Sequence, residues 1–306
     1  MRRNKIPARL SWGLLGLALF CSCASQEGGA LPPSGLAQAT QSAGPSPAKQ
    51  GAAQMSDQVT VSYSPADASL SLHEPVVLNF AVSNGSQQPV SLDLGQDRKE
   101  AFSITVKGPD GRRVQLPPLR REGISLVGTI PLAAQQTYTQ RLLLNEWYEF
   151  AAPGPYEVVI RLDNPVRGPG GVTVHEPTES RIELKIGPRD ADRLRQRAEA
   201  LAARASNKAS YEEAAEAALT LGHINDPVAV PYLEQVLAAN TMVRPIVFRG
   251  LERVATGEAV RVLASALDDP DSEVSQLARS ALSTIERTGK DPRAKESAKR
   301  ALSKPI

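Results

Sequence analysis

Cysteine and histidine, which often act as nucleophiles, general bases or metal ligands, are both scarce in this sequence. The two cysteines, Cys21 and Cys23, lie together near the N-terminus, and none follows them. The three histidines, His73, His175 and His223, are far apart and form no H-x-x-x-H or H-E-x-x-H pattern. Thiolate and imidazole zinc sites need such ligands at close spacing. The sequence therefore predicts no catalytic residue, no metal site and no cofactor, and we expect a protein that is not an enzyme.

Length and charge narrow the class of protein further. A chain of 306 residues with 41% apolar residues has room for about two domains with real cores. Thirty-five Lys and Arg against 33 Asp and Glu give a net charge of +2, with the two signs mixed along the chain. Nucleic-acid binding needs a basic face or stripe, which this balance does not provide. We therefore expect no nucleic acid among its partners.

The N-terminal residues 1–23 have the pattern of an export signal. The basic stretch MRRNKIPAR precedes the uncharged run LSWGLLGLALF, which is shorter than the about 20 apolar residues that span a bilayer. The next residues, FCSC, resemble the lipobox of bacterial lipoproteins, and the resemblance implies lipid attachment at Cys23, directly after the small Ser22. The alternative is cleavage after Ala24, which would release a soluble periplasmic or secreted protein. We expect a cell-envelope protein anchored to a membrane by lipid.

Residues 24–57 are dominated by Ala, Ser, Gly, Pro and Gln and show no apolar period. Such a composition cannot bury enough apolar surface to offset chain entropy, so we predict a disordered linker. Its end-to-end distance would be roughly 30 Å. Anchor and linker together predict a tethered domain.

Residues 58–187 show the period-two pattern of short β-strands separated by turn signals. In VVLNFAVSN, for example, Val76, Leu78, Phe80 and Val82 alternate with smaller or polar neighbours, which predicts one buried face. The pattern predicts an antiparallel β-sandwich with strands that include ASLSLH, VSLDL and TYTQRLLL. The segments HEPVVLNFAVSNGSQQPVSLDL, FSITVKGPDGRRV and APGPYEVVIRL resemble bacterial immunoglobulin-like sandwiches, and in more detail the intracellular proteinase inhibitor family of bacilli. That resemblance implies the fold, and it makes protease inhibition an alternative function with no inhibitory residue to transfer.

Residues 189–306 shift to a period of 3.6 and become rich in alanine, with helix, turn and helix recurring three times after a first capping helix at 190–207. Leu219, Leu251 and Leu282 recur in the first helices at a period of roughly 31 residues, which marks a stacked helical array. The expected ends of the first helices are Gly222, Gly257 and Gly289, and Asp226, Asp271 and Asp291 are expected at helix entries. The segments AALTLGHINDPVAVPYLEQVL and GLERVATGEAVRVLASALDDPDSEVSQLARSALSTI resemble short bacterial HEAT repeats. The resemblance implies a curved α-solenoid that binds other proteins.

Partner binding could involve an aromatic stretch and two charged loops. In NEWYEFAAPGPY, neighbours in an extended chain face opposite sides, so we expect Trp147 to plug the end of the sandwich, Tyr148 to be exposed and Tyr156 to lie in the core. The loop candidates are Asp97 and Arg98 in GQDRKE, and Arg120 and Arg121 in PPLRREG. Ordinary solvated loops are the alternative for both. The sequence thus predicts a multidomain β-then-α chain that serves as a non-catalytic, lipid-anchored scaffold in the cell envelope, with protein partners of unknown identity.

Overall fold

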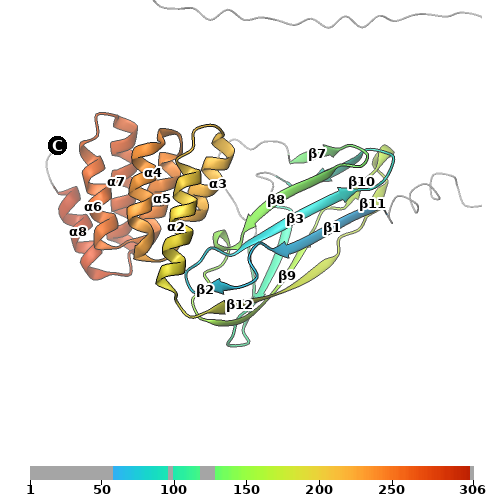
Figure 1. The fold of residues 1–306 in the computed structure, drawn as a ribbon, viewed down its shortest axis with the longest axis horizontal. Coiled ribbons are helices and arrows are strands. Elements are labelled where there is room, and N and C mark those ends of the chain that lie inside the picture. Colours follow the sequence, from blue (N-terminus) through green and yellow to red (C-terminus); the bar gives the residue numbers. More distant parts are fainter. Residues whose placement is uncertain (1–57, 96–98, 118–127, 304–306) are drawn as a thin grey trace, which may run out of the picture. The chain divides into compact units, whose positions relative to one another are not determined.

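The computed structural model describes residues 58–95, 99–117 and 128–303, which form a β-rich region followed by a helical region (Figure 1). The predicted signal, linker and lipid attachment residue Cys23 lie outside these ranges. So do all four loop candidates, Asp97, Arg98, Arg120 and Arg121. The structure therefore bears on the domains from residue 58 onward.

Within the described residues the strands form three sheets. The first has the order β1 (Val59–Pro65), β3 (Val77–Asn84), β8 (Thr137–Leu143). The second has the order β11 (Thr173–His175), β10 (Val166–Arg167), β4 (Val90–Asp93), β7 (Thr129–Leu132). The third has the order β2 (Leu70–Ser71), β12 (Glu179–Gly187), β9 (Gly154–Leu162), β5 (Phe102–Lys107), β6 (Arg113–Gln115). Every pairing is antiparallel except that of β2 with β12.

The predicted alternation of apolar residues in β3 is confirmed, because Leu78, Phe80 and Val82 are fully buried. Phe80 meets Phe102 of β5 edge to face, with ring centroids 5.0 Å apart. Such aromatic pairs add to the free energy gained by burying the rings. Tyr156 at the start of β9 is buried, as expected, and its hydroxyl donates to the carbonyl of Ala152. One core therefore joins the first and third sheets.

The predicted strand ASLSLH is wrong for most of its length, since only the two residues of β2 are extended. The chain turns there because the Glu74 carboxylate accepts the backbone N–H of Ser71, and His73 takes a positive φ of 75°. Strands β7, β10 and β11 were not predicted from the sequence. They are two to four residues long, too short to show a period.

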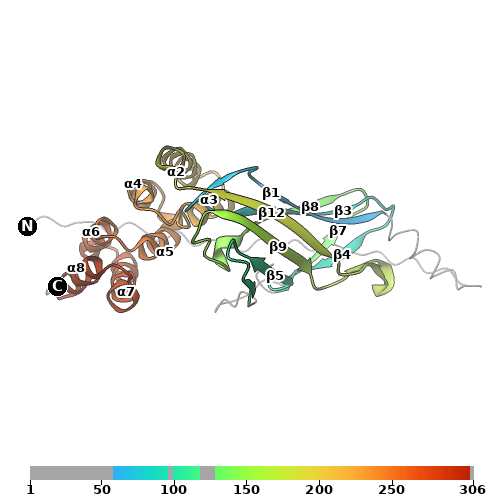
Figure 2. The same ribbon diagram turned by 90° about the horizontal axis from the view of Figure 1, so that it is seen from below.

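The helical region contains seven α-helices in the described chain. They are α2 (Ala191–Ala205), α3 (Tyr211–Leu221), α4 (Val230–Ala239), α5 (Arg244–Val254), α6 (Gly257–Ser265), α7 (Ser272–Thr288) and α8 (Pro292–Leu302). After α2, three helical pairs follow, as the sequence predicts. The first helices α3, α5 and α7 contact one another in one row, and α2, α4 and α6 form a second row (Figure 2). The aspartates expected at helix entries do cap them: Asp226, Asp271 and Asp291 each accept a backbone N–H two residues on.

Two details of the predicted repeat register are wrong. Leu219 is only half-buried, and Leu221 takes the fully buried position in α3 beside the equally buried Leu251 and Leu282 of later pairs. Helix α5 ends at Ala255, which adopts a left-handed φ of 49°, whereas Gly257 begins the next helix. Alanine-rich helices leave the buried stripe ambiguous in the sequence, because small residues occur on both faces.

Candidate functional site

Helix α2 is attached to the β-rich region by a buried carboxylate. Glu74 is 5% exposed, and its two carboxylate oxygens each accept from Arg193 Nε of α2 at 2.8 Å. The same carboxylate accepts the N–H of Ser71 at 2.6 Å, and the Ser71 hydroxyl accepts the N–H of Asp190, the N-cap of α2, at 2.8 Å. Charge-assisted hydrogen bonds of this kind are the stronger ones in proteins. This attachment fixes where the following helices begin.

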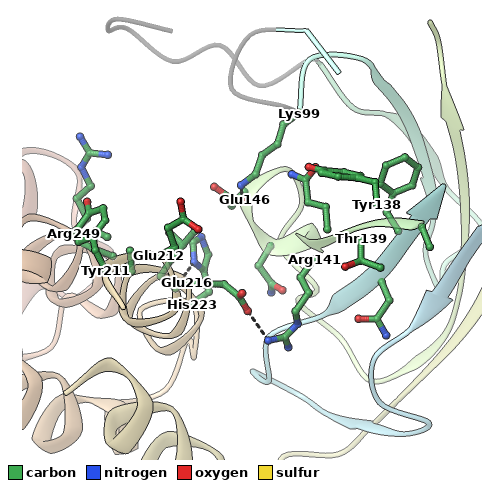
Figure 3. A pocket seen from close by; sticks show the side chains of 18 of the residues that line it. Lys99, Tyr138, Thr139, Arg141, Glu146, Tyr211, Glu212, Glu216, His223 and Arg249 are labelled. Atoms are coloured by element: carbon green, nitrogen blue, oxygen red, sulfur yellow. Dashed lines mark hydrogen bonds and ion pairs between the residues drawn. The ribbon is translucent and has the colours of Figure 1, made fainter. Parts of the chain in front are cut away.

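A hollow of about 1070 Å³, which we call the β8 hollow, opens between strand β8 and the first helices (Figure 3). Its β wall includes four consecutive residues of β8, positions 138–141. Its helical wall includes Glu212 and Glu216 of α3 and Arg249 and Arg253 of α5. In each helix these residues are four apart, which places both side chains of a pair on one helix face.

Two ion pairs already occupy part of the β8 hollow. Arg141 of β8 pairs with Glu216 across the hollow, and Lys99 pairs with Glu146 on the β side (Figure 3). Arg249, by contrast, is exposed and makes no hydrogen bond or ion pair with the described part of the chain. The hollow therefore keeps an available cation on its helical wall.

A second hollow of about 690 Å³ adjoins the first and extends along the helices to α7. Arg249, Arg253, His223 and Asn145 line both hollows. The first helices of all three pairs thus contribute to one open surface that faces the β-rich region. The two arginines of α5 lie where the hollows meet.

His223 lies at the junction of the two hollows but is itself buried, with 4% of its surface exposed. Its Nδ1 donates to the Leu219 carbonyl at 2.8 Å. Burial, with the nearby Arg253 charge, lowers the pKa of His223 to about 4. The imidazole is therefore neutral at physiological pH and acts as a structural hydrogen-bond donor.

The predicted aromatic candidates Trp147 and Tyr148 are both half-buried and pack against the β core. The expectation that they alternate along an extended chain is wrong, because a 3-10 turn, Leu144–Glu146, precedes them and Trp147 has helical backbone angles. Tyr148 packs edge to face on Phe150, with ring centroids 5.0 Å apart. Tyr148 still lines the second hollow, but it is far less exposed than predicted.

Sequence reasoning missed the charged pairs on α3 and α5. The available signal was Glu212 with Glu216 and Arg249 with Arg253, since charges four residues apart must share a helix face. Lys99 lies in the GQDRKE loop. Its pairing with Glu146 joins segments far apart in the chain, which no local pattern reveals.

No group of three or more His, Cys, Asp and Glu in the described ranges is arranged to hold a metal ion. In the same ranges no helix is both long enough and apolar enough to cross a membrane.

The comparisons with known proteins point to the helical region. A family model for HEAT repeats matches residues 198–283, a span that runs from within α2 to within α7. No curated protein matches the chain. Residues 198–283 of the helical region thus match a model of HEAT repeats, in agreement with the resemblance seen in the sequence.

Solved structures give only weak similarities. A structural genomics target, SoR45, shares 9% identity with a TM-score of 0.26, over 42% of this chain and 88% of its own. ApaA from Bordetella pertussis shares 15% identity with a TM-score of 0.25, over 42% and 93%. A β-glucosidase from Listeria innocua, solved with glucose, shares 14% identity with a TM-score of 0.24, over 43% of this chain and 16% of the enzyme. TM-scores this low carry no argument about fold or activity.

Proposed function

We propose that this chain is a non-catalytic protein-binding scaffold of the cell envelope, held at a membrane by a lipid on Cys23. In this proposal an immunoglobulin-like β-sandwich and a HEAT-type α-solenoid together form the binding surface. The observation that carries it is the HEAT-repeat match over 198–283, because HEAT arrays use the surface of their stacked helices to bind other proteins. The open surface formed by α3, α5 and α7 supports the same function.

The envelope location rests on the sequence of residues 1–23, with its basic stretch and short apolar run. Metabolic labelling with a radiolabelled fatty acid tests the anchor. The wild type should be labelled and Cys23→Ala should not. Equal labelling of the two proteins would remove the lipid anchor from the proposal and favour the soluble alternative. Protease inhibition stays a prediction from the sequence alone, since the matching family model covers the helical region.

Site-specific photo-cross-linking in the native envelope tests the binding surface. A photoreactive amino acid at Arg249, on the first helix α5, should capture a protein partner. The matched control carries the photoreactive amino acid at Glu258 on the second helix α6. Glu258 is also exposed, but it does not line either hollow. Capture from both positions alike, or from neither, would contradict a partner bound at this surface.

A further inference from the structure

Strand β8 is the last strand of the first sheet among the described residues, so one of its edges has no neighbouring strand. Proteins usually protect such edges with proline, lysine or a bulge, because unpaired backbone groups attract other strands. Strand β8, TYTQRLL, has no proline, no lysine and an unbroken register with β3. At the opposite end of the same sheet, β1 ends in Pro65.

The direction of the backbone groups of β8 follows from two hydrogen bonds at the ends of its pairing with β3. Asn84 N–H donates to the Gln136 carbonyl at 2.9 Å, and Leu144 N–H donates to the Val76 carbonyl at 2.8 Å. Backbone bonding in an antiparallel pair alternates with a period of two. Even-numbered residues of β8 therefore bond to β3, whereas the N–H and C=O groups of Thr139 and Arg141 point away from it.

The β8 hollow lies along this free edge. Four consecutive residues of β8, 138–141, line it together with residues 79–81 of the neighbouring strand β3. Its volume of about 1070 Å³ is at the upper end of ordinary ligand sites. An added strand would need only about 4.8 Å of separation from β8.

The charges of the hollow indicate the chemistry of its occupant. Glu216 and Glu146 are already paired with Arg141 and Lys99, whereas Arg249 has no partner among the described residues. Arg253, one turn further on α5, is exposed, and among the described residues it donates to the Gly222 carbonyl at 2.7 Å, with the carboxylates of Glu146 and Glu252 nearby. A carboxylate beside α5 would meet two cations. Since Glu212 of α3 is exposed on the same wall, an occupant acidic along its whole length is disfavoured.

We propose that the partner of this scaffold inserts an extended segment into the β8 hollow, where it pairs with the backbone of Thr139 and Arg141 and places an acidic side chain against Arg249 and Arg253. This rests on the proposed scaffold function and adds the form and charge of the bound segment. Main-chain hydrogen bonds supply affinity in strand addition, and side-chain contacts supply specificity. In this proposal Arg249 and Arg253 of α5 supply the specificity.

The test uses a proline that removes one outward N–H and leaves the pairing with β3 intact. Thr139→Pro loses the donor that faces the hollow, and a proline is tolerated in an edge strand at such a position. Thr137→Pro is the matched control, because it has the same strand and the same outward direction but does not line the hollow. Arg249→Glu reverses the charge of the helical wall and leaves β8 unchanged.

The probe is a phage-displayed library of random seven-residue peptides, selected against the complete chain. We expect enriched peptides of extended, alternating pattern with an acidic residue near one end. The best peptide should bind Thr139→Pro and Arg249→Glu about tenfold or more weakly than wild type, as the loss of one backbone or charged hydrogen bond implies. Its affinity for Thr137→Pro should change less than about twofold.

Amide hydrogen exchange measured by NMR gives an independent readout that needs no folded proline variant. In the free protein the amides of Thr139 and Arg141 should exchange quickly, and those of Tyr138 and Gln140, which face β3, should be protected. Adding the selected peptide should protect Thr139 and Arg141. Unchanged exchange at these two amides, selection of no peptide, or equal affinity for wild type and Thr139→Pro would overturn the inference.

Photo-cross-linking from position 249 in the native envelope separates this inference from the scaffold function itself. If Thr139→Pro captures the same partner as wild type in equal yield, the scaffold stands and strand addition fails. If the wild-type background captures no partner, the scaffold function fails as well. The expected result is capture by the wild type and by Thr137→Pro, with a loss for Thr139→Pro.

Discussion

The β-rich and helical regions meet at two places that are built differently. On the α2 side, the buried Glu74 carboxylate accepts from both Ser71 N–H and Arg193. On the hollow side, the crossing contacts are ion pairs between partly exposed side chains, such as Arg141 with Glu216, which are 30% and 39% exposed. Burial raises the cost of breaking a pair, and water lowers it. The α2 side therefore holds the regions together, and the hollow side leaves surface open for binding.

The largest expected effect concerns His223, a buried ionisable group where the two hollows meet. Its folded pKa of about 4 lies below the ordinary histidine value of 6.5, so the unfolded chain binds the proton more readily. The stabilisation that comes from keeping His223 neutral is fully present above pH 6.5 and is lost as the pH falls toward 4. The total loss in the free energy of unfolding is about 3 kcal/mol, at 1.36 kcal/mol per pKa unit.

Urea unfolding between pH 7 and pH 4 measures this loss as the difference between wild type and His223→Gln. Subtracting the variant removes the contribution of the carboxylates, which titrate in both proteins. His175→Gln, at a half-exposed histidine of β11, is the control and should follow the wild type. A difference between wild type and His223→Gln that stays constant across this range would mean that His223 is not held neutral by burial.

The next effect tests the α2 side. Glu74→Ala leaves the Ser71 N–H without its acceptor and Arg193 without its carboxylate, so the free energy of unfolding should fall. Removing one partner of a fully buried pair costs roughly 3 to 5 kcal/mol. Because Arg193 is 39% exposed, water offsets part of that loss, and we expect about 2 kcal/mol. The measurement is equilibrium unfolding in urea at pH 7.

How much of this arrangement the sequence could predict depends on the range of each interaction. Helix caps such as Asp271 and the alternation around Phe80 are local, and both were predicted correctly. The attachment of Glu74 to Arg193 joins residues 119 apart in sequence, and no local pattern indicates it. Gly222 and Gly250 are a similar case, because a Cβ on Gly250 would lie 2.8 Å from the Gly222 Cα. Such a close approach of two helices follows only from their packing.

In the candidate site, too, local features could be predicted from the sequence and long-range features could not. The sequence identified helices α3 and α5, and their charged pairs at a spacing of four could have marked one face of each. The free edge of β8 could not be predicted, since it depends on which strand ends the sheet. The predicted exposure of Tyr148 was wrong, because it assumed that side chains alternate along an extended chain. The 3-10 turn before Tyr148 breaks that alternation.

A smaller effect is expected on the hollow side. Glu216→Ala removes the ion pair with Arg141, whose partly exposed partners are screened by water, so stability should fall by about 0.5 kcal/mol. The same unfolding measurement, repeated at high salt, should show most of this difference gone. If Glu216→Ala costs as much as Glu74→Ala, the two sides of the junction are equivalent and the hollow side is a structural contact.

The smallest effect concerns Glu149, which contacts Lys290 at 3.3 Å and Asn225 at 3.1 Å across the second hollow. The two charged side chains are 56% and 89% exposed, and pairs this exposed contribute little. Glu149→Ala should therefore unfold at the same urea concentration as wild type, within error. A clear loss of stability would show that this contact closes the second hollow, so that α7 would be unavailable to a partner and binding would depend on α3, α5 and β8 alone.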